Sequence, residues 1–409
     1  MDTQNIQNET NLVPLQGLGV VRGPVFVIAD DITGAAEIAG VCLRYGRTVS
    51  FGIDAIPDVL ADICIIATDT RSLTEDEAAA IHSKIAFEVF RQQPSLIFKK
   101  CDSVLRGFVL AELAATLEQS SYSKILLEPA NPSTGRCIAD GMYTVGGQLI
   151  HETGFAIDPD FPATDPSVQN MLIKRSRSHE SITNIQVGKL QSLERNTLSV
   201  PDCSSVEDMT HICSLADEQT LLCGSAVFFE QMMLCKGVFS EEMNTDAAFT
   251  LSTDFLLIAG TTHPESKRFA EKLQKNNCPV IKFPEEFLTE IIDEAAFAEW
   301  VNALVNQWQV CGKMSVGLSD RPVEFPDSKA VLKARLSAVA SRLLESCEVK
   351  ELLIEGGATT YSLLSALQWN SLTPLAELAP GVLRMKVNNS AGTFLTIKPG
   401  SYSWPEKMI

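Results

Sequence analysis

The feature of the sequence that most constrains the fold is a repeated alternation of short apolar runs and longer amphipathic stretches. The run Val25–Ala29 is followed by a polar turn and then by Ala35–Tyr45, whose apolar residues recur at helical spacing and which ends at Gly46. Ile63–Ala67 leads in the same way into an acidic stretch at residues 75–77, where negative charge suits the start of a helix. Repetition of strand, turn and helix is typical of a parallel α/β sheet.

The alternation continues through Leu96–Phe98 and a predicted helix at Val109–Leu117, and is then interrupted over residues 128–166. This interruption is rich in Pro, Gly and Asp but also contains scattered aromatic and aliphatic residues. Long irregular segments inside a compact domain commonly carry function. We therefore interpret residues 128–166 as an ordered loop over a site. Further strands are predicted at Ile185–Val187, Leu198–Val200 and Leu221–Leu222.

A second series of the same pattern follows near residue 240. Apolar runs at Phe255–Ala259, Leu352–Ile354 and Leu395–Ile397 each end in a turn that contains glycine. A chain of 409 residues exceeds one typical hydrophobic core. We predict an N-terminal tail (1–22) and two α/β domains (23–240 and 241–409), each with a mainly parallel sheet flanked by helices. Ligands of such sheets bind beyond the carboxyl ends of the strands, so the active site is expected in the interdomain cleft.

Composition excludes several classes of function. A formal net charge of −18 disfavours nucleic acid as a partner, because the phosphate backbone requires a basic face. No apolar run is long enough to span a membrane, and residues 1–18 do not resemble a signal peptide. The 11 cysteines include no C-x-x-C pair, which favours reduced thiols and a cytoplasmic location. The five histidines show no metal-binding spacing, so any metal ligands stay unknown. His263 could contact a nucleotide, although a helix cap or simple exposure is the plainer interpretation.

The first predicted strand end carries two adjacent carboxylates, Asp30 and Asp31, before Thr33 and Gly34. Such a pair can bind hydroxyl groups, hold Mg²⁺ or act as a general base. The free N–H groups of the helix that follows attract anions. The alternative is that the aspartates merely cap this helix, which Asp does well. The local sequence leaves both interpretations open.

The third strand end, Lys99–Gly107, places two ammonium groups, a carboxylate and the guanidinium of Arg106 within nine residues. Arg grips a carboxylate with two parallel hydrogen bonds, and Lys adds a mobile positive charge. Arg71 follows the neighbouring strand, and Arg136 in the irregular loop would complete a ring of cations. A solvated basic patch is the alternative. The cluster predicts an anionic ligand in an otherwise acidic protein.

Glycine-rich turns end the strands of the second domain. Gly356-Gly357-Ala358-Thr359 lies between a strand and a helix, where glycine allows close backbone approach to a phosphate and the helix offers N–H donors. Gly260-Thr261 and Lys398-Pro399-Gly400 occupy similar positions. Each of them alone is compatible with a plain tight turn. No P-loop and no protein-kinase signature occurs in the sequence.

Taken in chain order, the strand ends form a set of motifs that is more specific than any one of them. The set comprises Ala29–Ala35, Asp102–Gly107, Pro129–Pro132 with Gly135-Arg136, Glu152-Thr153 with Asp158-Pro159, Gly224–Ala226, Gly356–Thr359 and Lys398–Ser401. With this set, the chain resembles the four-carbon acid sugar kinase family from residue 25 to about residue 403. Members of that family phosphorylate tetronates or 3-oxo-tetronates at the terminal hydroxyl.

The resemblance implies an N-terminal domain that binds the sugar acid, a C-terminal domain that binds ATP, and phosphoryl transfer assisted by Mg²⁺ across the cleft. By position, the acid site would comprise Asp30, Arg71, Lys100, Asp102, Ser103 and Arg106, with Arg136 beside them. The ATP site would comprise Thr261, Gly356, Gly357, Ala358, Thr359 and Gly400. We expect Asp30 or Asp31 to accept the proton of the substrate hydroxyl. Which acid is used, its stereochemistry, the phosphorylated carbon and the oligomeric state, a homodimer included, stay open.

Three positions depart from the family pattern. Thr261 stands where serine is usual, Val227 ends a motif that usually ends in glycine, and the closing motif reads Tyr402-Ser403-Trp404 instead of an aromatic residue followed by glycine. One alternative is therefore a non-catalytic acid-binding or regulatory protein with a degenerate nucleotide site. A second alternative is a dehydrogenase or lyase acting on the same acids, although the sequence has no dinucleotide fingerprint.

Overall fold

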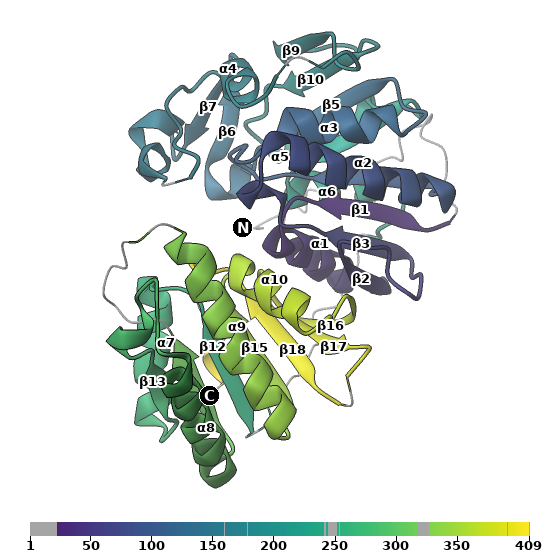
Figure 1. The fold of residues 1–409 in the computed structure, drawn as a ribbon. Coiled ribbons are helices and arrows are strands. Elements are labelled where there is room, and N and C mark those ends of the chain that lie inside the picture. The colour runs from purple at the N-terminus through teal and green to yellow at the C-terminus, as the bar shows by residue number, and fades with distance from the viewer. Residues whose placement is uncertain are drawn as a thin grey trace, which may run out of the picture.

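The computed structural model describes residues 23–408, apart from 159, 178, 241–242, 244–251, 253, 318–324, 326 and 391. The predicted tail, residues 1–22, and most of the predicted boundary between the domains lie outside the described residues. The described chain folds into two α/β domains (Figure 1). Elements β1 to α6 form the N-terminal domain, and β12 to β18 form the C-terminal domain together with helices α7 to α10.

Strands and helices alternate along both domains. The strands are β1 Val25–Ala29, β2 Val49–Ile53, β3 Ile63–Ala67, β4 Leu96–Lys100, β5 Lys124–Glu128, β6 Arg136–Ala139, β7 Met142–Val145, β8 Gln148–Leu149, β9 Asn184–Gly188, β10 Thr197–Pro201, β11 Thr220–Gly224, β12 Phe255–Ala259, β13 Val280–Lys282, β14 Met314–Gly317, β15 Glu351–Glu355, β16 Ser371–Ala379, β17 Val382–Val387 and β18 Phe394–Lys398. The helices are α1 Ile32–Arg44, α2 Glu75–Arg91, α3 Val109–Glu118, α4 Val168–Ile173, α5 Val206–Leu215, α6 Ala226–Cys235, α7 Pro264–Lys275, α8 Glu294–Cys311, α9 Ser328–Ser346 and α10 Gly357–Ala366.

In the described part of the chain the two domains share one sheet of 15 strands, in the order β13-β14-β12-β15-β18-β17-β16-β2-β3-β1-β4-β11-β5-β10-β9. The strands of the N-terminal domain in this sheet pair in parallel, as do β12 to β15 and β18. The antiparallel pair β16 and β17 joins the two parallel halves, because β16 also pairs with β2 of the N-terminal domain. Sequence periodicity predicts most of the parallel strands, but not β2, β5, β13, β14 or this junction.

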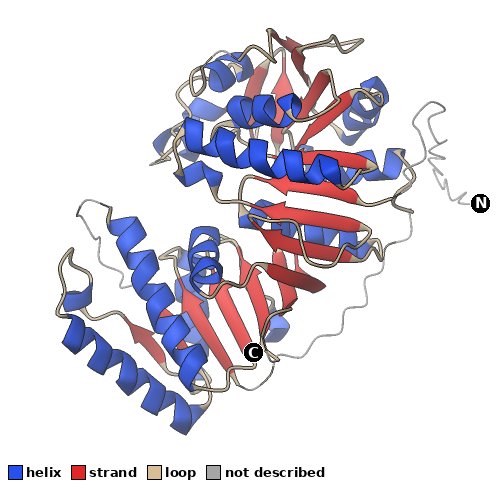
Figure 2. Cartoon of the chain, turned by 45° about the vertical axis from the view of Figure 1, so that its right-hand side comes forward, coloured by secondary structure: helices blue, strands red, loops and turns tan. Residues whose placement is uncertain are grey.

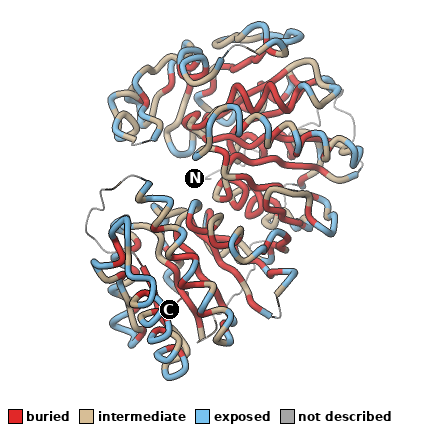
Figure 3. Tube along the Cα trace, in the orientation of Figure 1, coloured by how far each residue is buried: buried red, intermediate tan, exposed pale blue. Residues whose placement is uncertain are grey.

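Three hydrophobic cores flank the sheet in the described part of the chain, as expected for strands buried on both sides, and the smallest of them lies wholly in the C-terminal domain. In β1, Val25 and Val27 face a core that extends into the C-terminal domain, whereas Phe26 and Ile28 face a core confined to the N-terminal domain. Helices α1 and α6 supply the first core, and α2 and α3 the second. The buried strands run through the middle of each domain, with helices on both faces (Figures 2 and 3).

The described part of residues 128–166, which interrupt the sequence pattern, is ordered as we expected, but it has more regular structure than a loop. Strands β6, β7 and β8 form a separate antiparallel sheet of three strands, followed by short 3₁₀ turns up to Ile157. Tyr143 of β7 is fully buried and its hydroxyl donates a hydrogen bond to the carbonyl oxygen of Ser103. This contact fixes the small sheet beside the turn that follows β4. None of the helices among the described residues is long and apolar enough to cross a membrane.

Candidate active site

A cleft of about 1290 Å³ lies between the carboxyl ends of strands from the two domains. The N-terminal domain lines it with Asp31, Thr33, Asp69, Arg71, Ser72, Arg106, Asp158, Asp160 and Phe161. The C-terminal domain lines it with residues 260–262, Leu288, residues 327–330, Leu332, Lys333, Leu336, residues 356–359, Pro399 and Gly400. Most of the residues singled out by sequence therefore lie at this cleft. Of the remaining ones, Asp30, Lys100 and Asp102 are buried beneath the lining.

The two adjacent aspartates take different positions at the end of β1. Asp31 is the N-cap of α1: its Oδ1 accepts the backbone N–H of Gly34 at 3.0 Å, and the hydroxyl of Thr33 donates to its Oδ2. This cap starts the helix at Ile32, before the predicted start at Ala35. The helix-cap interpretation thus holds for Asp31, yet the same side chain also faces the cleft. Asp30 is only 1% exposed, and its Oδ1 has no hydrogen-bond partner among the described residues.

Arg71 joins three carboxylates that follow the two strands β1 and β4. It follows β3, and its guanidinium contacts Asp30 Oδ2 at 2.6 Å, Asp31 Oδ1 at 3.0 Å and Asp102 Oδ1 at 3.5 Å. Parallel register explains the meeting, because Ala29 of β1 is aligned with Ala67 of β3 and with Lys100 of β4. Burial opposes ionisation of Asp30, but Arg71, Lys99 and Lys100 outweigh it and hold its pKa below the ordinary value.

Arg106 and Asp102 form a second ion pair at the end of β4. Arg106 Nε donates to Asp102 Oδ2 at 2.9 Å and Nη2 to Oδ1 at 2.8 Å, the two-bond geometry that arginine makes with carboxylates. Burial opposes the charge on Asp102, yet Arg71 and Arg106 lower its pKa well below the usual range. Arg106 also lies 3.4 Å from Asp158, and its side chain stays about one-third exposed toward the cleft.

The lysines of this cluster are buried, in contrast to the solvated patch that the sequence left open. Lys99 Nζ lies 2.8 Å from Glu112 Oε2 of α3. Lys100 points to the opposite face of the sheet, where its Nζ donates to the carbonyl of Cys101 and lies 3.9 Å from Glu37 Oε2. A Cβ on Gly34 would come within 2.7 Å of Asp31 Oδ1 and 2.8 Å of Lys100 Nζ, so a side chain at this position would displace one or both of these charged groups.

Arg136 is the predicted cation with the fewest internal partners. Its Nη1 donates to the hydroxyl of Ser103, and its guanidinium lies over the ring of Phe155 at 5.6 Å. Among the described residues, no carboxylate lies within ion-pairing distance of Arg136. Arg71 and Arg106, by comparison, are already paired with aspartates.

On the opposite side of the cleft, the glycine turns of the C-terminal domain are closely packed. Gly356 has a φ of 99°, which favours glycine, and α10 begins directly after it with free N–H groups. A Cβ on Gly260 would overlap the side chain of buried Thr359, and a Cβ on Gly400 would lie 3.0 Å from Thr261 Oγ1. Thr359 therefore packs against the turn at Gly260, and Thr261 packs against the turn at Gly400.

The turns of the two domains are in direct contact. A Cβ on Gly357 would lie 2.8 Å from Cγ2 of Thr33, two residues after Asp31. The predicted anion-binding turn of α10 and the carboxylate turn of α1 are thus neighbours across the cleft. Lys329 of α9 and Asp160 also bridge the domains, with Nζ 2.7 Å from Oδ1.

The unusual closing motif is well accommodated. Trp404 Nε1 donates to Glu355 Oε1 at 2.6 Å, and Lys398 Nζ lies 3.5 Å from the same oxygen. Ser403 Oγ donates to Glu265 Oε2 at 2.7 Å. Glu355 is the last residue of β15, so this buried network supports the strand end that leads into Gly356. His263 caps α7 by accepting the N–H of Glu265, in agreement with the plainer interpretation of that histidine.

Several cleft residues were not expected from the sequence. They include Asp69, Asp160 and Phe161 on the N-terminal side, and Leu288, Lys329, Leu332, Lys333 and Leu336 on the C-terminal side. Asp69 had a usable signal, because it lies two residues beyond the end of β3 just as Asp31 lies two beyond β1. The residues of α9 gave no such signal, since they come from the start of a helix and not from a strand end.

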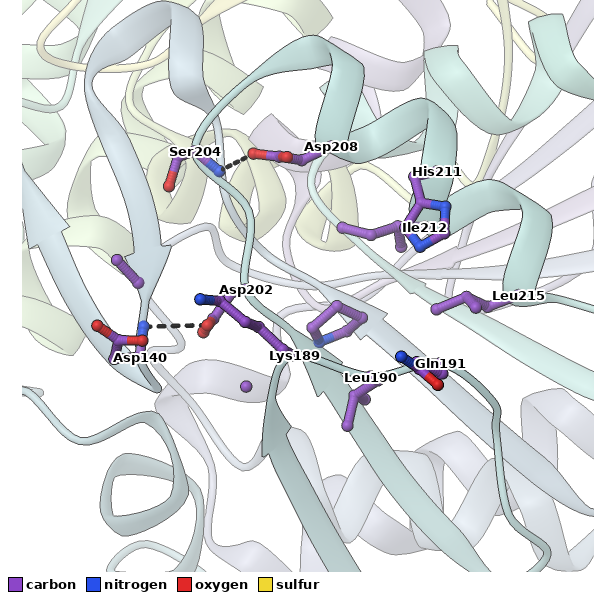
Figure 4. Close-up of a pocket in the computed structure, with 13 residues that line it drawn as sticks. Asp140, Lys189, Leu190, Gln191, Asp202, Ser204, Asp208, His211, Ile212 and Leu215 are labelled. Carbon is purple, nitrogen blue, oxygen red and sulfur yellow. Dashed lines mark hydrogen bonds between the residues drawn. The ribbon is translucent and has the colours of Figure 1, made fainter.

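A second hollow, of about 550 Å³, lies beyond the ends of β9 and β10 (Figure 4). In it, the carboxylate of Asp202 accepts the N–H of Asp140, and that of Asp208 accepts the N–H of Ser204. Lys189 and His211 also face this hollow. It contains none of the residues predicted for a site.

Comparison with known proteins matches both domains. Residues 25–232 match the family model of a sugar-binding N-terminal domain, and residues 256–402 match that of a nucleotide-binding C-terminal domain. A D-threonate kinase of Bordetella bronchiseptica is 22% identical over 95% of this chain and 96% of its own length. A 3-oxo-tetronate kinase of Pseudomonas savastanoi pv. phaseolicola is 25% identical over 92% and 93%. A D-threonate kinase of Salmonella typhimurium is 28% identical over 49% of this chain and 51% of its own.

Solved structures share the fold. A Salmonella typhimurium LT2 protein, provisionally named as a tRNA synthase, superimposes with a TM-score of 0.71 at 17% identity over 93% of this chain and 96% of its own. A Haemophilus influenzae protein of a family of unknown function gives a TM-score of 0.69 at 15% identity over 92% and 97%. At such identities the likeness concerns the two-domain architecture alone.

Proposed function

The chain belongs to the four-carbon acid sugar kinase family, in which a sugar-binding N-terminal domain precedes a nucleotide-binding C-terminal domain, and from this we propose that it is an ATP-dependent kinase of a small sugar acid. The acid would be a four-carbon tetronate or 3-oxo-tetronate, the classes that the names of its relatives indicate. The phosphoryl group would be transferred to one of its hydroxyl groups.

The observation that carries this proposal is the contact between the two turns across the cleft. Gly357 abuts Thr33, so a phosphate held at the start of α10 would lie beside a hydroxyl held at Asp31. Free N–H groups at a helix start bind phosphate, and phosphoryl transfer depends mainly on such positioning and on charge neutralisation. The closing motif supports this arrangement, because Trp404 and Lys398 hold Glu355 just before the turn.

We assign the acid's carboxylate to Arg136 and Arg106. Arg136 has no carboxylate partner among the described residues, and Arg106 keeps part of its guanidinium exposed beside Asp102. Arg71 is held by three carboxylates, so its contribution is chiefly to fix them and to balance their charge. Lys100 and Ser103 lie behind this surface and orient its groups. Ser103 does so through Arg136.

Of the two adjacent aspartates, we assign Asp31 as the acceptor of the hydroxyl proton. Asp31 lines the cleft, whereas Asp30 is buried behind it and anchors Arg71. A general base must come within hydrogen-bond reach of the proton that it removes. Asp31 meets this condition if the substrate hydroxyl takes the position of the Thr33 hydroxyl on its carboxylate.

Magnesium enters as part of the nucleotide substrate, MgATP. Mg²⁺ in kinases is bound largely by phosphate oxygens and water, with one or two carboxylates. Among the described residues no cluster of three or more metal-binding side chains occurs, which fits an ion carried by the triphosphate better than an all-protein site. We further infer a cytoplasmic enzyme, consistent with cysteines that are all free. A homodimer stays a prediction.

The test is a screen of four-carbon sugar acids with MgATP, with product mass as the readout, alongside Asp31→Asn. We expect one or more acids to gain a phosphoryl group in the wild type. The variant should lose turnover while binding MgATP as before. Failure of every acid despite tight MgATP binding would contradict the substrate assignment, and wild-type turnover by Asp31→Asn would contradict the assigned base. Absence of MgATP binding would instead favour the non-catalytic acid-binding alternative.

A further inference from the structure

Asp69 is a carboxylate in the cleft that the mechanism above does not use. It lies two residues beyond the end of β3, beside Asp31 beyond β1, because the two strands pair in register. Its Oδ2 accepts a hydrogen bond from the hydroxyl of Ser72 at 3.3 Å. Within the described residues, no Lys, Arg or His lies within ion-pairing distance of its oxygens. The side chain therefore has unused acceptor capacity on the surface of the cleft.

The other carboxylates that line the cleft differ from Asp69. Asp31 is paired with Arg71, Asp158 with Arg106 and Asp160 with Lys329, whereas Asp327 is exposed. Asp69 is thus the partly buried carboxylate of the described lining that has no ion pair of its own. A partly buried polar group without a partner favours a ligand that can hydrogen-bond to it.

The charge on Asp69 decides which ligand group suits it. Burial raises the pKa of Asp69 to about 6, with Lys333 of α9 and Arg71 opposing the rise and Asp31 adding to it. Ser72 on its own turn donates a hydrogen bond to Asp69, and Tyr361 of α10 interacts with it electrostatically. At neutral pH the side chain is therefore mainly an ionised carboxylate, which accepts hydrogen bonds and donates none.

We propose that Asp69 accepts a hydrogen bond from the hydroxyl on carbon 3 of the sugar acid and so selects tetronates with a hydroxyl at that carbon over 3-oxo-tetronates. This inference rests on the proposed function and deepens it. A hydroxyl can donate a hydrogen bond to the carboxylate. A ketone oxygen in the same place cannot, because the ketone and the carboxylate are both hydrogen-bond acceptors. Sites built to bond a substrate hydroxyl reject analogues that lack it, because their polar groups are then left unpaired.

The experiment measures kcat/KM for a tetronate and for the corresponding 3-oxo-tetronate, with saturating MgATP at pH 7.5, in the wild type, Asp69→Ala and Asp69→Asn. We expect the wild type to prefer the hydroxylated acid. Asp69→Ala should lower kcat/KM for that acid by about 10- to 100-fold, the range of a hydrogen bond to a charged group, and leave the 3-oxo acid little changed. Asp69→Asn, whose amide can donate to a ketone, should shift the preference toward the 3-oxo acid.

Asp327→Asn is the matched control, because it makes the same change at an exposed carboxylate of the same cleft. Its ratio of kcat/KM for the two acids should equal that of the wild type. Equal losses for both acids in Asp69→Ala and Asp69→Asn, with unchanged melting temperatures, would overturn the proposal, as would a wild-type preference for the 3-oxo acid. If the wild type phosphorylates neither acid, the proposed function fails. If it phosphorylates either acid with a ratio independent of residue 69, the inference alone fails.

Discussion

Replacing Arg71 by Met should destabilise the protein strongly, because this guanidinium is the partner of three carboxylates from two strand ends. Asp102 would keep its pair with Arg106, and Asp31 is partly exposed and keeps its bond from Gly34. Asp30, at 1% exposure, would be left with no ion pair within 4 Å among the described residues. Removing one partner of a buried pair costs about 3–5 kcal/mol.

We take the lower end, about 3 kcal/mol, because Lys99 and Lys100 still favour the charge on Asp30. For a domain of this size that corresponds to a fall in melting temperature of about 6–12 °C. The assay is thermal unfolding at pH 7.5, with Arg177→Met as the matched control. Arg177 is 71% exposed and pairs with Glu75 and Asp76 at the surface, so its loss should cost less than about 1 kcal/mol.

The dependence on pH provides a second check. The pKa of Asp30 is lowered in the folded protein, so its contribution to stability is present above the ordinary Asp pKa of 3.8 and is lost as the pH falls through the folded value. The difference between wild type and Arg71→Met should therefore be full at neutral pH and shrink below about pH 4. A melting temperature for Arg71→Met within 2 °C of the Arg177→Met value would refute the importance that we assign to Arg71.

Two further predictions concern the supporting structure. Burial raises the pKa of Glu128 to about 8, so between the ordinary Glu pKa of 4.5 and pH 8 the folded state binds a proton that the unfolded state does not, and wild-type stability falls as the pH rises through that range. Glu128→Gln should therefore melt a few degrees above the wild type at pH 8.5. The same difference in melting temperature between variant and wild type at pH 6 and at pH 8.5 would contradict this. Trp404→Phe removes the hydrogen-bond donor to Glu355 and should raise the KM for MgATP more than the KM for the acid. It should also lower the stability of the fold by about 1–3 kcal/mol. A change confined to the KM for the acid would speak against the supporting role of Trp404.

The sequence predicts most of the parallel strands of both domains to within a residue or two, but it does not predict β2, β5, β13 and β14. The runs Val25–Ala29, Ile63–Ala67 and Phe255–Ala259 are strands with the predicted bounds, because a short apolar run between polar turns is buried on both faces wherever it pairs. The same reasoning missed β16 and β17, which carry charged residues and a proline, such as Glu377 and Pro374. Their strand conformation depends on pairing with each other, with β2 and with β18.

The candidate site shows the same division. Motif positions after strands led to Asp31, Arg71, Arg106 and the glycine turns, which all line the cleft. Lys99 and Lys100 were predicted to lie beside these residues. In the structure they point to opposite faces of the sheet, because side chains alternate along β4, and this separation was not predicted from the sequence. Lys329 and Lys333 could not be expected, since they reach the cleft only because α9 points its first turn toward the N-terminal domain.

The sequence by itself determined which residues stand at strand ends, because strand length, turn chemistry and helix capping depend on near neighbours along the chain. It also determined that positive charge is concentrated after β4 in a protein of net charge −18. Only the tertiary structure decided what those charges do. Register across β3, β1 and β4 directs Arg71 onto three aspartates and puts Asp69 beside Asp31, where no ion pair reaches it among the described residues. These partners are distant in sequence, so the pairing of strands, and not local preference, sets the charge that faces the ligand.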